Sequence, residues 1–492
     1  MSHLFKEKKK ILVSIKLLLL AIVFFILVKT CLIYKGNQFI YILFSIISLF
    51  LVFFSFRKKS IFYENFFGVF IFLGFWLKFS VIESFDLGFT EGLSGKTILI
   101  SSQNYDDALI ASCIGMLGII FFGFIRQKFF FYPNKIELNI NTEFYKKFRN
   151  IFIILLFFII ILVCFLNFYF LIYQRGLVGN SYNFLISGFI KTSLLYFLSL
   201  CVAIILFFDL ASYKKIFFLI LSLVILEPFL SSVSMLSRGM IFNSLAIVFA
   251  LYKFSNKINL KLEINFYLKF LVFLFMAFYI SVISVNHLRI ANFNIGGPVI
   301  DENNKQNTEY KTITEKFKTN TSKSFHGFYH LLIHRWVGIN SMLLITKDKE
   351  FLNFGLFNKS LKEKYDSRSI SFYEKNFQIY PIDHYQKNSS IKGNTLPGLM
   401  AFLFFSGSYV FLFFSIILFS FFATLLEYLI YKSTNKNLIA SGLIGMVIAY
   451  RFAHFGYLPS RSYLLFGSII CLVILFFLVK FIAHFIEIKL KK

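Results

Sequence analysis

The 492-residue chain has few acidic side chains, cysteines and prolines. Asp and Glu number 24 against 51 Lys and Arg, so the formal net charge is +27 at pH 7. Only 6 prolines occur, which leaves long stretches without a helix breaker. No CxxC pair is present, so neither a zinc site nor a disulfide framework is expected. The 5 cysteines stand in apolar stretches, as small buried side chains do, at Cys31, Cys113, Cys164, Cys201 and Cys471.

Several enzyme motifs are also missing. The chain has no GxxxxGK[ST] sequence, which excludes an ATP-driven motor of the P-loop type. It has no GxSxG sequence, the nucleophile turn of many serine hydrolases. The nearest approach to a DxD pair is Asp348-Lys349-Glu350, which disfavours a metal-dependent enzyme that uses nucleotide sugars. The sequence therefore predicts neither a metal nor a cofactor.

Apolar residues dominate what is present. Hydrophobic residues make up 58% of the chain, with 73 Phe, and the mean hydropathy is +0.73. Because about 20 apolar residues in a helix cross a bilayer core, this pattern predicts an all-α, polytopic membrane protein with about 12 transmembrane helices. The expected spans are roughly 11–34, 38–56, 61–82, 108–126, 151–173, 185–208, 216–235, 240–253, 267–286, 407–431, 437–452 and 463–485.

The distribution of charge between these spans predicts their orientation. Short loops rich in Lys and Arg stay in the cytoplasm, and Arg57-Lys58-Lys59 and Lys214-Lys215 fall on one side together with both termini. The acidic loop 83–107 falls on the other side, as does the long polar segment 287–395. The basic residues thus set topology, and no nucleic-acid partner is expected. The chain divides into 1–286 with nine spans, the loop 287–395, and 396–492 with three spans.

Five arginines are expected at outer helix ends or in the outer loop. The guanidinium group presents a fixed fork of donors that matches phosphate oxygens. Each arginine taken alone could instead reach lipid headgroups or cap a helix end. Several on one face favour a pocket for a phosphate or pyrophosphate, and the tight hairpin Ser237-Arg238-Gly239 is its sharpest local feature. The five are Arg175, Arg238, Arg335, Arg451 and Arg461.

Histidines in the long loop are candidate general bases. His326, His330 and His334 are spaced i, i+4 and i+8, so they share one face if the segment is helical. No carboxylate or cysteine stands at ligand spacing beside them, which disfavours a metal site. A neutral imidazole can take a proton from a sugar hydroxyl. An ordinary amphipathic helix, packed through its apolar face, is the competing interpretation. Alternative bases are His384, His454, Glu83 and Asp86.

In topology and in several short motifs the chain resembles the Wzy-type O-antigen polysaccharide polymerases, or oligosaccharide repeat-unit polymerases, of the bacterial inner membrane. The shared topology is a dozen helices, cytoplasmic termini and one large, late periplasmic loop. An Arg-x10-Gly pattern found in some branches is absent at the outer arginines. The motifs that carry the resemblance are Gly74-Phe-Trp-Leu-Lys78, Ser237-Arg238-Gly239, Leu396-Pro397-Gly398 and Ser406-Gly407-Ser408-Tyr409, with Arg451 and Arg461.

This resemblance implies a metal-independent, GT-C-like membrane glycosyltransferase without a cofactor. Its substrates would be oligosaccharide repeat units on undecaprenyl pyrophosphate, and its partners membrane lipids, a chain-length regulator and a flippase. An O-antigen ligase with lipid A core as acceptor, and a lipid-linked oligosaccharide flippase or transporter, remain alternatives. The implied catalytic residues are His334, His330 and Arg335, and the implied pyrophosphate-binding residues are Arg238, Arg175, Arg451 and Arg461.

Overall fold

The fold consists of helices and their connections. The computed structural model describes residues 2–89, 101–133, 142–175, 182–258, 260, 264–293, 336–363, 371–377, 396–456 and 459–490. No strand occurs within these ranges. The all-α prediction is therefore confirmed for the described part of the chain.

The long helices stand where the sequence places its spans. Two spans are interrupted by a π-turn, namely α3 (Phe62–Phe72), η1 (Leu73–Leu77) and α4 (Lys78–Ser84), and α7 (Phe184–Thr192), η3 (Ser193–Phe197) and α8 (Leu198–Tyr213). The others are α1 (Ser2–Ile33), α2 (Gln38–Ser55), α5 (Ser102–Arg126), α6 (Glu143–Phe170), α9 (Phe218–Ser234), α10 (Ile241–Lys257), α11 (Ile264–Phe293), α18 (Tyr409–Ser433), α19 (Leu438–Ala453) and α20 (Pro459–Leu490).

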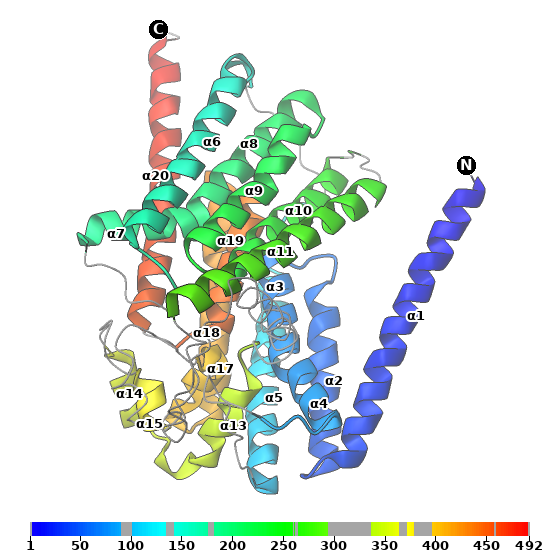
Figure 1. The fold of residues 1–492 in the computed structure, drawn as a ribbon. Helices are drawn as coiled ribbons and strands as arrows, with labels where there is room; N and C mark the ends of the chain where they lie inside the picture. Colours follow the sequence, from blue (N-terminus) through cyan, green and yellow to red (C-terminus); the bar gives the residue numbers. More distant parts are fainter. Residues whose placement is uncertain are drawn as a thin grey trace, which may run out of the picture.

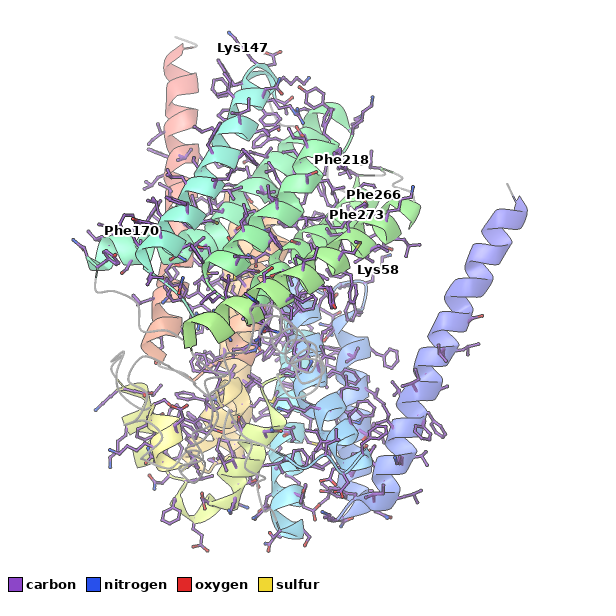
Figure 2. All side chains as sticks on the ribbon, viewed as in Figure 1. Lys58, Lys147, Phe170, Phe218, Phe266 and Phe273 are labelled. Carbon is purple, nitrogen blue, oxygen red and sulfur yellow. The ribbon has the colours of Figure 1, made fainter. Side chains whose placement is uncertain are left out.

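Length and apolarity identify this as a membrane-embedded protein. In the described residues, 8 helices are long and apolar enough to cross a membrane, and three shorter apolar helices accompany them at Leu20–Ile33, Phe218–Ser234 and Leu438–Ala453. These helices thus support a polytopic membrane protein, whereas the expected count of about 12 crossings exceeds the 8 long apolar helices of the described residues. Phe170, Phe218 and Phe273, which are labelled in Figure 2, are 43%, 82% and 63% exposed. Such apolar surfaces suit contact with lipid.

Short helices form in the described parts of the chain between α11 and α18. Figure 1 shows α13 to α15 at the lower end of the molecule, whereas α1 begins and α20 ends at the upper end. Both termini thus lie opposite the described parts of the long segment, which is the arrangement the sequence predicts. The short helices are α13 (Ile339–Lys347), η5 (Lys349–Phe351), α14 (Phe354–Leu361), α15 (Phe372–Asn376), α17 (Gly398–Leu403) and η6 (Phe404–Ser406).

Helix α19 forms the centre of the bundle. It packs against α3, α10 and α18, and nearly all of its side chains are buried. Close approach depends on small residues: a Cβ added at Gly445 would lie 2.5 Å from Glu427 Oε2 and 2.9 Å from the Tyr63 nitrogen. Glu427 uses this proximity to cap α3, because its carboxylate accepts the backbone N–H groups of Phe62 at 2.9 Å and Tyr63 at 2.6 Å. These are donors that the helix itself leaves unsatisfied.

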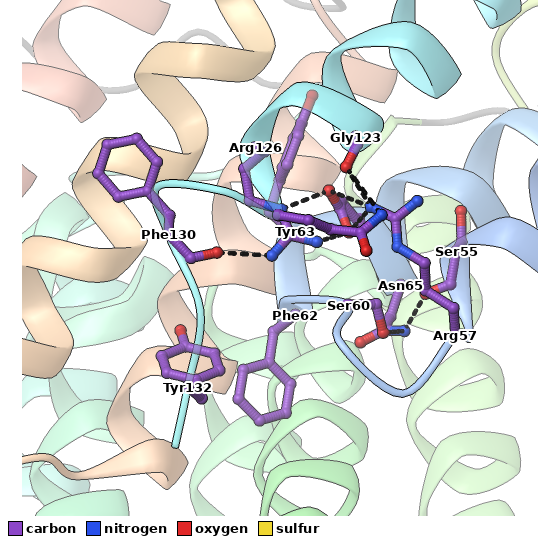
Figure 3. Close-up of polar contacts among 12 residues, drawn as sticks. Ser55, Arg57, Ser60, Phe62, Tyr63, Asn65, Gly123, Arg126, Phe130 and Tyr132 are labelled. Atoms are coloured by element: carbon purple, nitrogen blue, oxygen red, sulfur yellow. Dashed lines mark hydrogen bonds and ion pairs between the residues drawn. The ribbon is translucent and has the colours of Figure 1, made fainter. Parts of the chain in front are cut away.

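A buried ion pair joins α3 to α5. Arg126, 1% exposed, donates from Nε and Nη2 to the two carboxylate oxygens of Glu64, at 2.9 and 2.8 Å. Its Nη1 donates to the Phe130 carbonyl at 2.7 Å (Figure 3). Arg57, from the turn after α2, approaches the same carboxylate at 3.4 Å. The bidentate geometry and the third hydrogen bond give each of the three guanidinium nitrogens a partner.

Candidate functional site

Three arginines gather where the ends of α6, α9 and α11 meet. The backbone N–H of Arg175, in the turn after α6, donates to the Met235 carbonyl at 2.9 Å. Arg289 of α11 donates from Nη2 to the carbonyls of Leu236, at 2.6 Å, and Arg175, at 3.4 Å. Arg238 begins the 3-10 turn η4 (Arg238–Met240), directly after the turn that follows α9 and contains Leu236. The two turns that carry Arg175 and Arg238 are therefore held together by a third arginine.

Local backbone chemistry explains the shape of these turns. Leu236 takes a left-handed conformation, with φ 51°, and the Ser237 N–H donates to the Ser232 carbonyl at 2.8 Å. From α6, the buried side-chain amide of Asn167 donates to the carbonyls of Tyr173, at 3.1 Å, and Ser234, at 3.0 Å. One amide thus fixes the end of α9 against the turn that carries Arg175.

Tyr450, near the end of α19, connects this cluster to the centre of the bundle. The Arg175 guanidinium hydrogen-bonds the hydroxyls of Tyr450 and Tyr173. Burial lowers the pKa of Arg175, but the tyrosine hydroxyls more than offset this, so the pKa is raised and the side chain stays charged. A Cβ added at Gly239 would lie 2.6 Å from the Tyr450 hydroxyl. His454 stacks on the Tyr450 ring, with centroids 4.2 Å apart.

The middle of the long segment, at Trp336, docks beside the same aromatic residues. Lys78 is 4% exposed, and its Nζ donates to the Trp336 carbonyl at 2.9 Å. The Trp336 ring lies 6.2 Å from those of Phe70 and Phe242, each of which lies 5.8 Å from the Tyr450 ring. Trp336, two residues after His334, therefore lies next to the arginine cluster.

The motif Gly74-Phe-Trp-Leu-Lys78 provides this docking surface. Its first four residues lie in the π-turn η1, an irregularity that occurs often at functional sites. At Gly74 the two segments are in direct contact, because an added Cβ would lie 2.2 Å from the Val337 carbonyl oxygen.

Replacing Gly74 with alanine should therefore separate the two segments. The Val337 backbone has to move, and we expect the free energy of unfolding to fall by about 1–3 kcal/mol, the usual effect of overpacking. Gly188→Ala, on α7, is the matched control: nothing lies within 4 Å of its added Cβ, so alanine should stabilise it by about 0.5–1 kcal/mol. Thermal unfolding of both purified variants in detergent measures the difference. Equal stability of the two variants would contradict the close contact at Gly74.

The predicted site residues fall into three groups. Arg175 and Arg238 come together, and Arg451 directly follows Tyr450, which bonds Arg175. Arg461 belongs to α20, but its side chain lies outside the described residues. The remaining predicted loop residues also lie outside the described residues; they are His326, His330, His334, Arg335 and His384.

Two of the alternative bases lie in a different cluster. Glu83, at the end of α4, hydrogen-bonds Tyr105 and interacts with Asp86. The Tyr105 ring in turn lies 6.1 Å from that of Tyr34. This contact network joins α1, α4 and α5. His454 is the alternative base that the structure places at the arginine cluster, through its stacking on Tyr450.

The segment leading into α18 contains the short helix α17, and every residue of α17 is buried. The Gly398 N–H donates to the Phe455 carbonyl at 2.9 Å, and Ser341 Oγ donates to the Leu396 carbonyl at 3.0 Å. Leu396-Pro397-Gly398 thus anchors this helix between α13 and the turn after α19.

Arg289 and Tyr450 are the residues of the cluster that the sequence did not single out. Helix α11 runs to Phe293, past the end expected near residue 286. Asn286 and Arg289 are spaced i, i+3 and share a face. Asn286 Oδ1 accepts a hydrogen bond from Arg238, while Arg289 donates to Leu236. Polar residues that keep helical spacing beyond the apolar run were the available signal.

Comparison with known proteins adds no relative. No protein-family model matches the chain, and no curated protein and no solved structure matches it. Within the described part of the chain, no three His, Cys, Asp or Glu side chains are grouped so that they could hold a metal ion. The arginine cluster and its surroundings are the candidate site.

Proposed function

We propose that the protein is a metal-independent membrane glycosyltransferase that joins undecaprenyl-pyrophosphate-linked oligosaccharide repeat units into O-antigen or a similar surface polysaccharide. The observation that carries the proposal is the convergence of Arg175, Arg238 and Arg289 beside Tyr450. Three guanidinium groups at the ends of apolar helices suit a pyrophosphate whose lipid tail stays in the bilayer. Trp336, within the long segment, lies beside them.

The reaction follows from the charges involved. A hydroxyl group of the acceptor glycan attacks the anomeric carbon of the donor, the bond from that carbon to the pyrophosphate breaks, and a new glycosidic bond forms. Negative charge grows on the departing pyrophosphate, where Arg175 and Arg238 stabilise it. A histidine takes the hydroxyl proton. His330 and His334 are the loop candidates, and His454 is the candidate beside Tyr450.

The proposal includes a location and partners. About 12 spans with cytoplasmic termini in the bacterial inner membrane would place the arginine cluster on the periplasmic face. A flippase would supply the lipid-linked repeat unit there, and a chain-length regulator would set the extent of polymerisation. The O-antigen ligase shares this chemistry and differs in its acceptor.

A gene deletion tests the proposed function. We expect the deletion strain to show lipopolysaccharide with a single repeat unit and no ladder of longer chains on a gel stained for glycan. Complementation with the intact gene should restore the ladder. Loss of all repeat units from the lipid A core would indicate a ligase instead, and an unchanged ladder would contradict both activities.

A further inference from the structure

Glu227, on α9, is a buried carboxyl group without a cationic partner. Its side chain is fully buried, and no Lys or Arg of the described residues forms an ion pair with it. Two other buried carboxylates differ: Glu64 pairs with Arg126 at 2.8 Å, and Asp209 pairs with Arg149 at 2.7 Å. An ionised carboxylate within apolar helices is costly unless a positive charge compensates it.

The partners of Glu227 are neutral hydroxyl groups. Ser231, one turn later on α9, donates to Oε1 at 2.8 Å, and Ser199 of α8 hydrogen-bonds Oε2. Ser199 Oγ in turn accepts from the side-chain amide of Asn243 on α10, at 2.9 Å. Two helices thus place hydroxyl groups on the carboxyl group, a third supports one of these hydroxyls through Asn243, and none of these groups carries a charge.

Two breaks in helical hydrogen bonding flank this cluster. Pro228 lacks the N–H that would bond the Val224 carbonyl, and Ser244 Oγ donates to that carbonyl instead, at 2.7 Å. The π-turn η3 precedes Ser199, and Asn243 donates to the Leu195 carbonyl in this turn at 3.1 Å. Neighbouring residues of α10 therefore satisfy carbonyl groups at both irregularities. Interruptions of this kind are common at functional sites.

Among the described residues, no charged side chain interacts with Glu227. Helices α6, α8, α10 and α11 and the turn η4 pack against α9. The titratable groups that interact with Glu227 are the thiols of Cys164 on α6 and Cys201 on α8. Its contacts on α8 and on α9 itself are the hydroxyls of Ser199 and Ser231. Within the described residues, α10, α11 and η4 bring no charged side chain into interaction with it.

We infer that Glu227, with Ser199 and Ser231, forms a proton-binding site inside the membrane, in which the carboxyl group carries a proton at neutral pH. The proton removes the uncompensated charge. The two hydroxyls and the carboxyl group supply fewer oxygen atoms than the six to eight that a hard metal cation requires. This site is separate from the arginine cluster and goes beyond the proposed glycosyl transfer.

Infrared spectroscopy of the intact protein in liposomes tests the inference. A protonated carboxyl group has a carbonyl stretch that a carboxylate lacks, and it shifts on exchange into heavy water. We expect the wild type to show this band at neutral pH and Glu227→Gln to lose it. Glu350→Gln is the matched control, because Glu350 is exposed on η5 and its substitution should leave the band unchanged. Identical spectra for wild type and Glu227→Gln would overturn the inference.

A second pair of variants tests the inference even if Glu227→Gln does not fold. Ser199→Ala and Ser231→Ala each remove one hydroxyl partner of the carboxyl group and keep Glu227. We expect both to shift the frequency of the band, because hydrogen bonding to the carboxyl group changes. An unshifted band in both would overturn the assignment. A rise in unfolding temperature with Na⁺ in the wild type, absent in these variants, would identify a metal cation site and overturn it as well.

Discussion

Arg238→Ala is expected to abolish chain extension while the protein still enters the membrane. Arg238 lies in the hairpin that joins α9 to α10, beside Arg175 and Arg289. Loss of a preorganised donor to a developing anion typically slows a reaction by about 10²–10³-fold. The measurement is the glycan ladder of a deletion strain that carries the variant, with membrane levels of the protein determined in parallel.

Two further variants separate charge from geometry. Arg238→Lys keeps the positive charge but lacks the planar fork of donors, so we expect shorter chains rather than none. Lys347→Ala is the control for loss of a cation, because Lys347 is exposed at the end of α13, and its ladder should be normal. A normal ladder from Arg238→Ala, at normal membrane levels, would exclude Arg238 from the proposed pyrophosphate site.

Glu64→Ala is expected to destabilise the bundle severely. The variant leaves the guanidinium of Arg126, which is 1% exposed, without its bidentate partner. Breaking a buried pair in this way costs about 3–5 kcal/mol, because a desolvated charge stays behind. Arg57, at 3.4 Å, adds a second uncompensated cation. Unfolding of the purified variant in detergent, followed by temperature or denaturant, measures the loss of stability.

An exposed ion pair supplies the matched control. Lys349 and Asp107 lie 3.1 Å apart with side chains 42% and 20% exposed, so Asp107→Ala should cost only about 0–1 kcal/mol. Replacing Glu64 and Arg126 together by leucine should recover part of the stability lost in Glu64→Ala, since the buried charge of Arg126 is removed and only Arg57 is left without its carboxylate. If Glu64→Ala and Asp107→Ala were equally stable, the buried pair would have no structural role.

The candidate site could be predicted in part. Arg175 and Arg238 could be identified from the sequence, because charged residues directly beside apolar runs are unusual. Arg289 did not stand out, since its helix continues beyond the apolar segment to Phe293. Tyr450 could not be identified from the sequence either, because an aromatic residue in an apolar helix looks like any other core residue until its neighbours are known.

The sequence by itself determined the positions of the long helices and the membrane-embedded class of the protein. These follow from local properties, because an apolar run of about 20 residues has few stable solutions other than a helix in lipid. Only the tertiary structure decided which polar groups meet. Glu427 caps α3 from 364 residues away, and Arg289 holds the turns of Arg175 and Leu236. Such pairings depend on which helices pack together, and hydropathy carries no information about the partner of a helix.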